Sequence, residues 1–279
     1  MFVKKVILIF IITLMYQNTL YSKSTSFNDF DSKNLSKYFS GIVAFENKNN
    51  SVALDFFNSS KILITKHDPY LKRYIYSLVL ENKVSQAINV IKNNRYRDNS
   101  NFFDAYLLLV LDSLKKKDLD SAYKYLENIT DLAQEDKFNS VILEILKQYI
   151  FVFKEKKTPE GKKNFGKLSL ISETFQRCFI GDKKTEKYFS NLINDFEADY
   201  SRYIFFYLSY LIENNQVNQA KKIAKDINYI NTTLLLSQAK SWIENKEVEK
   251  FMNVFSCKNY NDVISEYMFL ISNLYSTQN

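Results

Sequence analysis

The residues of this chain that could do chemistry are few. The one histidine, His67, stands in an expected turn, and no serine or cysteine forms a recognised nucleophile signature with it. Asp118 and Asp120, and the acidic cluster in 195–199, could serve as acid–base pairs or metal ligands, but they fall at expected turns and helix ends, where carboxylates cap or solvate. Zinc, dinucleotide and phosphate-loop motifs are absent from the sequence. The sequence therefore predicts no catalytic residue, no metal site, no cofactor and no enzyme activity.

The elements around these residues follow a repeat. A short phrase reads E-N-K-V-S-Q-A at 81–87, K-K-D-L-D-S-A at 116–122, E-N-N-Q-V-N-Q-A at 213–220 and E-N-K-E-V-E-K-F at 244–251. One position recurs along the chain and holds a small or an aromatic residue: Ala53, Ala87, Ala122, Tyr188, Ala220 and Phe251. The spacings between these residues are 34, 35, 66, 32 and 31. A period of about 34 residues is typical of stacked helix–turn–helix units. The Asn and Asp residues of the phrase suit a tight turn, because they tolerate left-handed backbone geometry.

With this phrase the chain resembles the tetratricopeptide repeat family over about residues 33–279. The matching positions are Gly41, Ala53 and Phe57 in the first unit, Leu71, Tyr74, Leu78, Ala87 and Ile91 in the second, Tyr106, Leu109, Ala122 and Leu126 in the third, and Ile204, Tyr207, Leu211, Ala220 and Ala224 in the sixth. The resemblance implies an all-α fold, a right-handed α-solenoid of about seven helix–turn–helix repeats. Only 4 Gly and 2 Pro in 279 residues also favour helices over a many-stranded fold.

The apolar periodicity predicts helices in pairs. We expect them at 34–47 and 51–66, 70–81 and 84–94, 103–116 and 119–131, 138–154, 165–180 and 183–195, 200–213 and 216–227, 231–244 and 247–256, and 262–276. The segment 158–161, with Pro159 and Gly161, stands where a second helix is due. It suggests a weak boundary between an N-terminal half, 34–157, and a C-terminal half, 158–279.

The first 24 residues have the features of a secretory signal peptide. Lys4 and Lys5 precede the apolar run 6–16, and a small-residue cleavage site ends at Ser24. Eleven apolar residues are too few to span a bilayer, which takes about 20. We expect residues 1–24 to be removed, 25–33 to be a flexible segment, and the mature protein to be exported to the periplasm. The alternative is an uncleaved leader, which would be the chain's only membrane contact.

The net charge of +7 does not predict a nucleic-acid partner. Five of the 38 basic residues are Arg and the rest are Lys, whereas phosphate recognition favours Arg. The Lys, Asn, Ile, Phe and Tyr content is typical of an AT-rich genome, and no nucleic-acid motif occurs.

In the tetratricopeptide family the first helix of each unit lines a concave groove, and the resemblance extends this role to eight positions here. These are Tyr38, Phe45, Lys72, Tyr76, Asp104, Leu107, Arg202 and Phe205. Aromatic, Lys and Arg side chains in a groove suit an extended or helical peptide. We therefore expect a non-enzymatic scaffold of the bacterial cell envelope that binds a protein or peptide. The alternative is the helical N-terminal arm of a longer peptidoglycan enzyme whose catalytic domain lies outside this chain.

Two further expectations concern the C-terminal half. The last helix is either a terminal cap or the first helix of a further repeat in a truncated sequence. Leu270, Ile271 and Leu274 would leave an apolar surface without a partner there, which favours truncation, with self-association as a third option. Cys178 and Cys257 lie 79 residues apart, in units that are not adjacent. An exported protein could oxidise them, but the repeat predicts two separate thiols.

Overall fold

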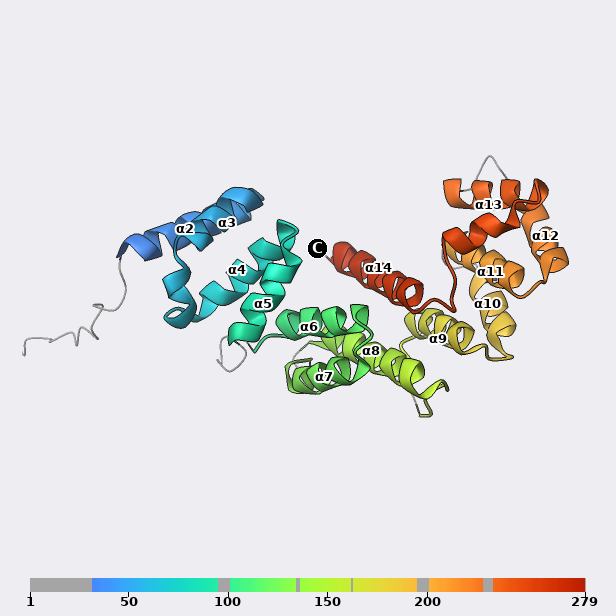
Figure 1. Cartoon of the computed structure of the whole chain (residues 1–279), viewed down its shortest axis with the longest axis horizontal. Coiled ribbons are helices and arrows are strands. Elements are labelled where there is room, and N and C mark those ends of the chain that lie inside the picture. Colours follow the sequence, from blue (N-terminus) through green and yellow to red (C-terminus); the bar gives the residue numbers. More distant parts are fainter. Residues whose placement is uncertain are drawn as a thin grey trace, which may run out of the picture. The chain divides into compact units, whose positions relative to one another are not determined.

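The computed structural model describes residues 32–94, 101–133, 136–161, 163–194, 201–227 and 233–278. Within these ranges every regular element is a helix and no strand occurs, so the all-α fold class is confirmed (Figure 1). The chain forms two compact units, Met1–Ser100 and Asn101–Asn279. The predicted signal peptide, 1–24, lies outside the described residues, whereas Ser32 and Lys33, expected to be flexible, already belong to the first described helix.

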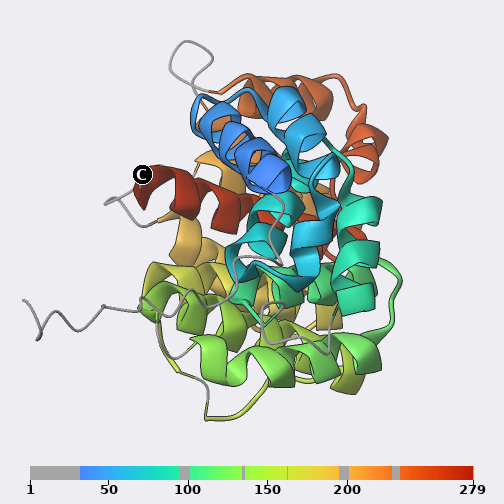
Figure 2. The ribbon, with the colours of Figure 1, turned by 90° about the vertical axis from the view of Figure 1, so that its left-hand side faces the viewer.

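The first unit consists of two helical hairpins joined by a short 3-10 helix. Its elements are α2 (Ser32–Glu46), α3 (Asn50–Asn58), η2 (Lys61–Thr65), α4 (Asp68–Leu80) and α5 (Val84–Asn94). Helices α2 and α3 lie side by side, as Figure 2 shows in blue. Gly41 allows this close approach, because a Cβ there would lie 2.8 Å from the Phe57 ring.

One helix of the first unit is shorter than the sequence predicts. The run 51–66 was expected to be continuous, but α3 ends at Asn58 and η2 follows. The buried Ser60 hydroxyl donates to the Phe56 carbonyl oxygen at 2.9 Å, and the Tyr70 hydroxyl donates to that of Phe57. These side chains take the carbonyl groups that a continuing helix would need, and a serine hydroxyl commonly competes with the helix in this way.

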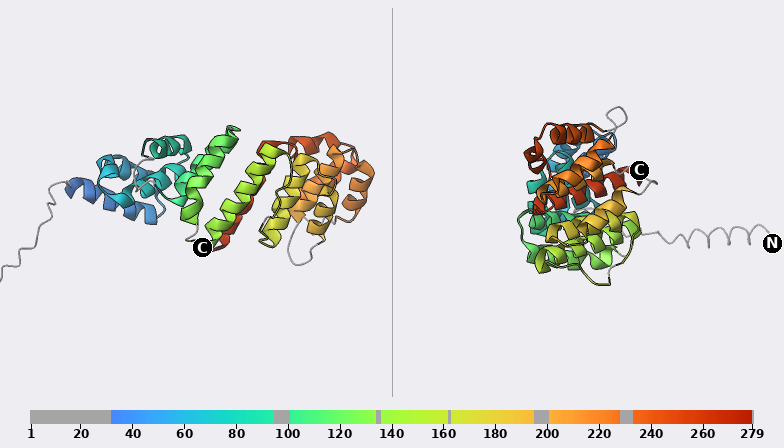
Figure 3. Two further views of the ribbon diagram at one scale, coloured as in Figure 1. Left: turned by 90° about the horizontal axis from the view of Figure 1, so that it is seen from below. Right: turned by 90° about the vertical axis from the view of Figure 1, so that its right-hand side faces the viewer.

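The second unit continues the pattern of consecutive helices. Its elements are α6 (Phe103–Lys115), α7 (Leu119–Ala133), α8 (Lys137–Glu155), α9 (Lys167–Ile180), α10 (Thr185–Ile193), α11 (Ser201–Glu213), α12 (Val217–Lys225), α13 (Leu234–Glu244), η4 (Val248–Asn253) and α14 (Tyr260–Gln278). From α6 to η4 each element packs against the next one along the chain. Helix α14 departs from this order: it lies beside α8 and α9 (Figure 3, left, red).

The turns inside the hairpins repeat in geometry as well as in sequence. Five residues have left-handed φ angles between 58° and 63°: Lys48, Asn82, Lys117, Asn215 and Lys246. In each turn the next N–H donates to the carbonyl oxygen five residues before it, for example Lys83 N to Leu78 O at 2.8 Å and Glu247 N to Trp242 O at 2.7 Å. This hydrogen bond closes the C-terminus of the preceding helix. The predicted left-handed geometry at Asn is confirmed for Asn82 and Asn215, whereas in the 116–122 turn the left-handed residue is Lys117 and not Asp118.

The recurring position of the phrase is buried in five of its six occurrences. Ala53, Ala87, Ala122, Ala220 and Phe251 are fully buried. Tyr188 is the exception: it is half-buried, and the Arg177 guanidinium lies 4.5 Å from its ring centroid. Helix α10 begins four residues after the left-handed Gly181, whereas the other second helices begin two residues after theirs. The longer turn changes which residue of α10 faces inward, and the adjacent Phe189 is the buried one.

The compact units divide at residues 100 and 101, and not at the 157/158 break that Pro159 and Gly161 suggest. Helices α8 and α9 on the two sides of that break contact each other, and α14 joins both of them. The contacts of α14 with α8 and α9 therefore keep both helices in one compact unit, although the helix is interrupted at 158–161. None of the helices in the described ranges is long and apolar enough to cross a membrane.

Candidate binding faces of the two units

The eight residues predicted to line one groove are divided between the two units. Tyr38, Phe45, Lys72 and Tyr76 belong to the first unit, and Asp104, Leu107, Arg202 and Phe205 belong to the second. Each unit therefore has its own candidate face, and the two faces differ in what covers them.

Two of the eight predicted groove residues are core residues. Tyr38 is 3% exposed, and its ring packs against those of Phe57 and His67 at centroid distances of 5.9 and 4.7 Å. Phe205 is 0% exposed and stacks on Phe251 at 5.4 Å. Both side chains pack on elements of their own unit, which does not favour a groove role for Tyr38, whereas Phe205 also contributes to the lining of a hollow described below. His67, the chain's only histidine, stands at the N-cap position of α4.

Arg202 is the predicted residue with the richest contacts. Its Nε lies 3.0 and 3.1 Å from the two carboxylate oxygens of Glu266 on α14, and its Nη2 lies 2.5 Å from Oε2. The guanidinium also lies over two aromatic rings, 4.2 Å from the Phe269 centroid and 5.1 Å from that of Phe206. Charge-assisted contacts with two-point geometry are among the stronger hydrogen bonds in proteins. They fix α14 to α11.

The pair is electrostatically uneven. Glu266 is buried, while the Arg202 side chain is 40% exposed. Burial raises the pKa of the Glu266 carboxyl, and the hydrogen bonds and charge of Arg202 lower it only in part. The hydrogen bonds to Glu266 raise the pKa of the Arg202 guanidinium in turn. Arg202 therefore offsets part of the cost of burying this carboxyl.

Glu266 belongs to a stretch that we name the return segment, residues 254–274, because it leads the chain back from η4 to α8 and α9. Phe255 lies near its start, and the Phe255 ring centroid lies 4.2 Å from that of Phe206 and 5.6 Å from that of Phe175. The Ser209 hydroxyl donates to the Phe255 carbonyl oxygen at 2.7 Å. The face of α9 and α11 thus holds an aromatic side chain and a main-chain carbonyl of this segment.

A disulfide also joins the return segment to α9. Cys178 on α9 and Cys257 in the return segment are bonded, with their Cα atoms 5.7 Å apart, and both are buried. The prediction of two separate thiols is therefore wrong. It assumed that each unit contacts only its neighbours, but the return segment brings Cys257 back to α9.

Helix α14 completes the covering of this face. The Tyr267 hydroxyl donates to the Ile142 carbonyl oxygen of α8 at 3.1 Å, and the Tyr260 ring lies 4.3 Å from that of Phe153. Ile271 is buried, and Leu270 and Leu274 pack against the core of the second unit. The expectation that these three side chains would lack a partner is therefore wrong.

A hollow of about 370 Å³ remains between α11 and the return segment. Its lining includes the predicted groove residues Arg202 and Phe205, together with Phe206, Leu235, Glu266 and Phe269. Val254 and Phe269 are exposed on its rim, at 49% and 44%. The other two predicted residues of this unit lie on α6, where Asp104 is half-buried in the first turn and Leu107 packs against the core.

The first unit presents a different face, which we name the cation–aromatic cluster: Phe45, Glu46, Lys72, Arg73 and Tyr76. The Arg73 guanidinium lies 5.3 Å from the Phe45 ring centroid and pairs with Glu46 at 3.1 Å. The Lys72 ammonium lies 5.6 Å from the Tyr76 ring centroid. Phe45 and Tyr76 are partly buried and Lys72 is exposed. Sequence reasoning missed Arg73 and Glu46, although Arg73 is one of only five arginines.

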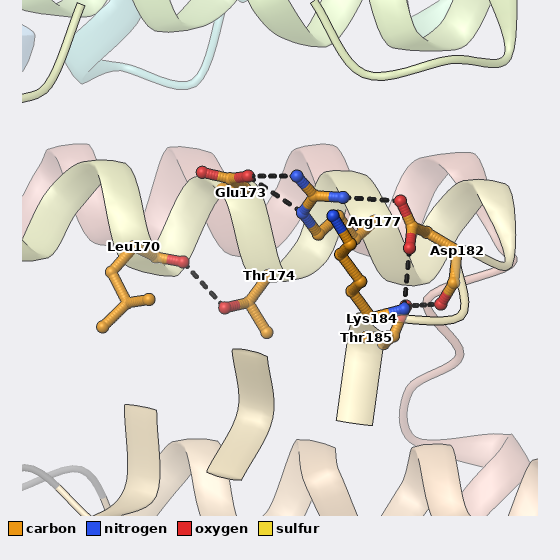
Figure 4. Close-up of polar contacts among 7 residues, drawn as sticks. All are labelled: Leu170, Glu173, Thr174, Arg177, Asp182, Lys184 and Thr185. Carbon is orange, nitrogen blue, oxygen red and sulfur yellow. Dashed lines mark hydrogen bonds and ion pairs between the residues drawn. The ribbon is translucent and has the colours of Figure 1, made fainter. Parts of the chain in front are cut away.

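A second polar cluster, on α9 and the α9–α10 turn, fixes a turn. Arg177 donates from Nε and Nη2 to Glu173 Oε1 at 2.8 and 2.6 Å, and from Nη1 to Asp182 Oδ2 at 2.5 Å (Figure 4). The Thr185 hydroxyl donates to the Asp182 carbonyl oxygen at 2.6 Å. These bonds hold the start of α10 against α9. Among the described residues no three or more His, Cys, Asp or Glu side chains are placed to hold a metal ion.

Comparisons with known proteins do not add to this geometry. The chain matches no family model, no curated protein and no solved structure. Its function is inferred below from the two faces themselves.

Proposed function

We propose that this chain is a non-enzymatic, exported scaffold of helical hairpins that binds segments of other polypeptides. The recurrence of one left-handed turn at Lys48, Asn82, Lys117, Asn215 and Lys246 supports a repeat array similar to the tetratricopeptide family. In such a right-handed α-solenoid of about seven repeats, each hairpin buries its apolar side against the next and offers its first helix to a ligand.

The observation that carries the proposal is the return segment on the face of α9 and α11. This face takes Phe255 between the rings of Phe206 and Phe175, and it bonds the Phe255 main-chain carbonyl through Ser209. An aromatic anchor combined with a main-chain hydrogen bond is how grooves recognise peptides generally. The second unit thus packs a segment of its own chain through the kinds of contact that we propose for a partner.

The cation–aromatic cluster of the first unit is the proposed site for a partner. Phe45 and Tyr76 supply accessible aromatic surface, and Lys72 and Arg73 supply positive charge. The Arg73–Glu46 ion pair is partly exposed, and such pairs contribute little stability. A partner's carboxylate can replace Glu46 at small cost. We therefore propose a segment with apolar side chains and at least one carboxylate.

Export to the periplasm belongs to the same proposal. The leader pattern at 1–24 supports it. The Cys178–Cys257 disulfide supports it as well, because disulfides persist in oxidising compartments and are rare in the cytosol.

Site-specific photo-crosslinking tests the proposal. A photoreactive residue at Tyr76, in the full chain expressed in its own cells, should give a discrete polypeptide adduct. The matched control places the same residue at Gln86, which is exposed on the second helix of that hairpin. Charge reversal with Lys72→Glu and Arg73→Glu should reduce the adduct at position 76 about tenfold, the loss expected for one charge-assisted contact. Adducts of equal yield at positions 76 and 86, or no effect of charge reversal, would contradict the assignment.

A further inference from the structure

The first described hairpin, α2 and α3, has one covered face and one open face. On the covered face the Tyr70 ring of α4 lies 5.7 Å from that of Tyr38 and 6.0 Å from that of Phe57. The open face holds Phe39 and Val43, which are 57% and 61% exposed. Stacked hairpins bury such side chains against a neighbour, and a hairpin that ends a stack usually has a polar outer face. An exposed apolar pair here is therefore suited to a further contact.

A shallow hollow of about 570 Å³ lies on this open face. Its lining consists of three large apolar side chains and three small residues, which together we name the α2 face: Phe39, Val43, Phe56, Ser36, Ser40 and Ala44. None of the six is charged, although 25% of the residues of the chain are. The lining therefore favours an apolar occupant.

The charged residues of α2 are distributed unevenly along the helix. Lys33 and Lys37 belong to its first half, and Glu46, its only carboxylate, lies in its last turn. A second, antiparallel α2 would bring the basic half of one copy beside the acidic end of the other, and the two helix dipoles would run in opposite directions. A parallel copy would place the lysines together, and like charges at a contact are costly. The charge pattern therefore fits an antiparallel second copy of this chain.

A two-fold axis produces such an antiparallel pair, and two-fold dimers are the commonest protein homo-oligomers. The same surface occurs on both sides of a two-fold contact, so it must contain the projecting side chains and also the space that receives them. The α2 face contains both. Phe39 and Val43 are exposed, and small residues such as Ser36 and Ser40 line the hollow beside them.

We propose that the α2 face binds the α2 face of a second copy, so that the chain forms a two-fold symmetric homodimer. Phe39 and Val43 of each copy enter the hollow of the other, and Ser40 lies near the two-fold axis. The contact involves one face of one hairpin, and small interfaces are usually weak. We therefore expect a Kd on the order of 10 µM. The α2 face shares no residue with the cation–aromatic cluster, so the homodimer does not depend on partner binding there.

Sedimentation equilibrium of the full chain from about 1 to 200 µM tests the proposal. The average mass should rise from one copy to two and no further, because a two-fold contact closes. Phe39→Glu should raise the Kd about tenfold or more, since it brings two carboxylates together in an apolar contact. The matched control, Ile62→Glu, adds the same charge at a residue of η2 that is 56% exposed and outside the α2 face. It should change the Kd less than about twofold.

A cysteine at position 40 tests where the axis lies. Ser40→Cys adds the only free thiol of the chain, because Cys178 and Cys257 are bonded to each other. Mild oxidation should link two copies of this variant through a disulfide. Ser85→Cys, exposed on α5 of the same unit, is the control and should not form a linked dimer. Equal linking at the two positions would contradict an axis at α2.

Three results of the mass measurement would overturn the homodimer. The first is a mass of one copy over the whole concentration range. The second is association that Phe39→Glu leaves unchanged, since the contact would then lie elsewhere, for example in the apolar run 6–16. The third is association that continues beyond two copies. A monomeric wild type that Phe39→Glu destabilises would also overturn it, because another segment of the same chain would then cover the α2 face. Val43→Glu repeats the test if Phe39→Glu does not fold.

Discussion

The two units contain the same kind of helical hairpin, but a later segment of the chain covers the candidate face only in the second unit. In the second unit the return segment covers α9 and α11, with Glu266 paired to Arg202 and Cys257 bonded to Cys178. In the first unit Phe45 and Tyr76 are partly buried and lie beside Arg73 and Lys72 respectively. Predicted groove positions therefore differ in burial, and in the second unit the chain itself returns to cover some of them.

The comparison also shows how the covering is held. The return segment combines a covalent bond, a charged pair and an apolar contact, each to a different helix: Cys178 on α9, Arg202 on α11 and Tyr149 on α8. Losing one contact leaves the other two. We therefore expect graded effects when these contacts are removed singly.

The largest expected effect on the free energy of unfolding is that of replacing Phe205. Phe205→Ala should lower the free energy of unfolding by about 3–5 kcal/mol, because it leaves a cavity against Phe251 and Trp242. Tyr76→Ala, at a partly buried predicted groove position, should lower the free energy of unfolding by less, about 1 kcal/mol. Denaturant unfolding monitored by Trp242 fluorescence and by circular dichroism measures both, since Trp242 is the only tryptophan and lies in the second unit. Equal decreases in the free energy of unfolding in the two variants would contradict the difference in burial between Phe205 and Tyr76.

The disulfide gives the next effect. Cys178→Ser with Cys257→Ser should lower the free energy of unfolding by about 2–4 kcal/mol, because the bond restricts the unfolded chain. The Trp242 transition should shift to lower denaturant concentration. Dithiothreitol should shift wild type by a similar amount and leave the double variant unchanged. A wild-type transition that is insensitive to reductant would show that the cysteines are not paired.

The smallest effect concerns pH. Because burial raises the pKa of Glu266, the folded protein holds this proton more tightly than the unfolded chain does. The free energy of unfolding therefore falls as pH rises from the ordinary carboxyl pKa through the raised one. Glu266→Gln should lose this part of the pH dependence, measured by denaturant unfolding between pH 4 and 7. Glu127→Gln, an exposed glutamate on α7, is the control and should retain it. Parallel profiles for wild type and Glu266→Gln would contradict a buried carboxyl with a raised pKa.

The sequence predicted the helices well, because their signals are local. The expected helix 84–94 coincides with α5, and 200–213 differs from α11 by one residue. Helix α3 stops early because the hydroxyl groups of Ser60 and the more distant Tyr70 bond its last carbonyl groups. The apolar periodicity of the sequence does not reveal such hydrogen bonds. The spacing of the turns was readable because Asn82, Lys117 and Asn215 sit in a repeated phrase.

The return segment could not be predicted, because it depends on contacts between distant residues. The Ser209–Phe255 bond joins residues 46 apart, and the Tyr267–Ile142 bond joins residues 125 apart. The period of the repeat predicts neighbours only. It therefore predicted a free apolar surface at Leu270, Ile271 and Leu274, where the structure has packed side chains.

Hydrogen exchange along α14 tests most directly whether the return segment covers the second unit. In the oxidised full chain, the amides of 263–271 should be protected to the same degree as those of α11, because Tyr267 and Ile271 are buried. Amides of 263–271 that exchange orders of magnitude faster than those of α11 would show that the face of α9 and α11 is open, and would contradict the difference between the two units.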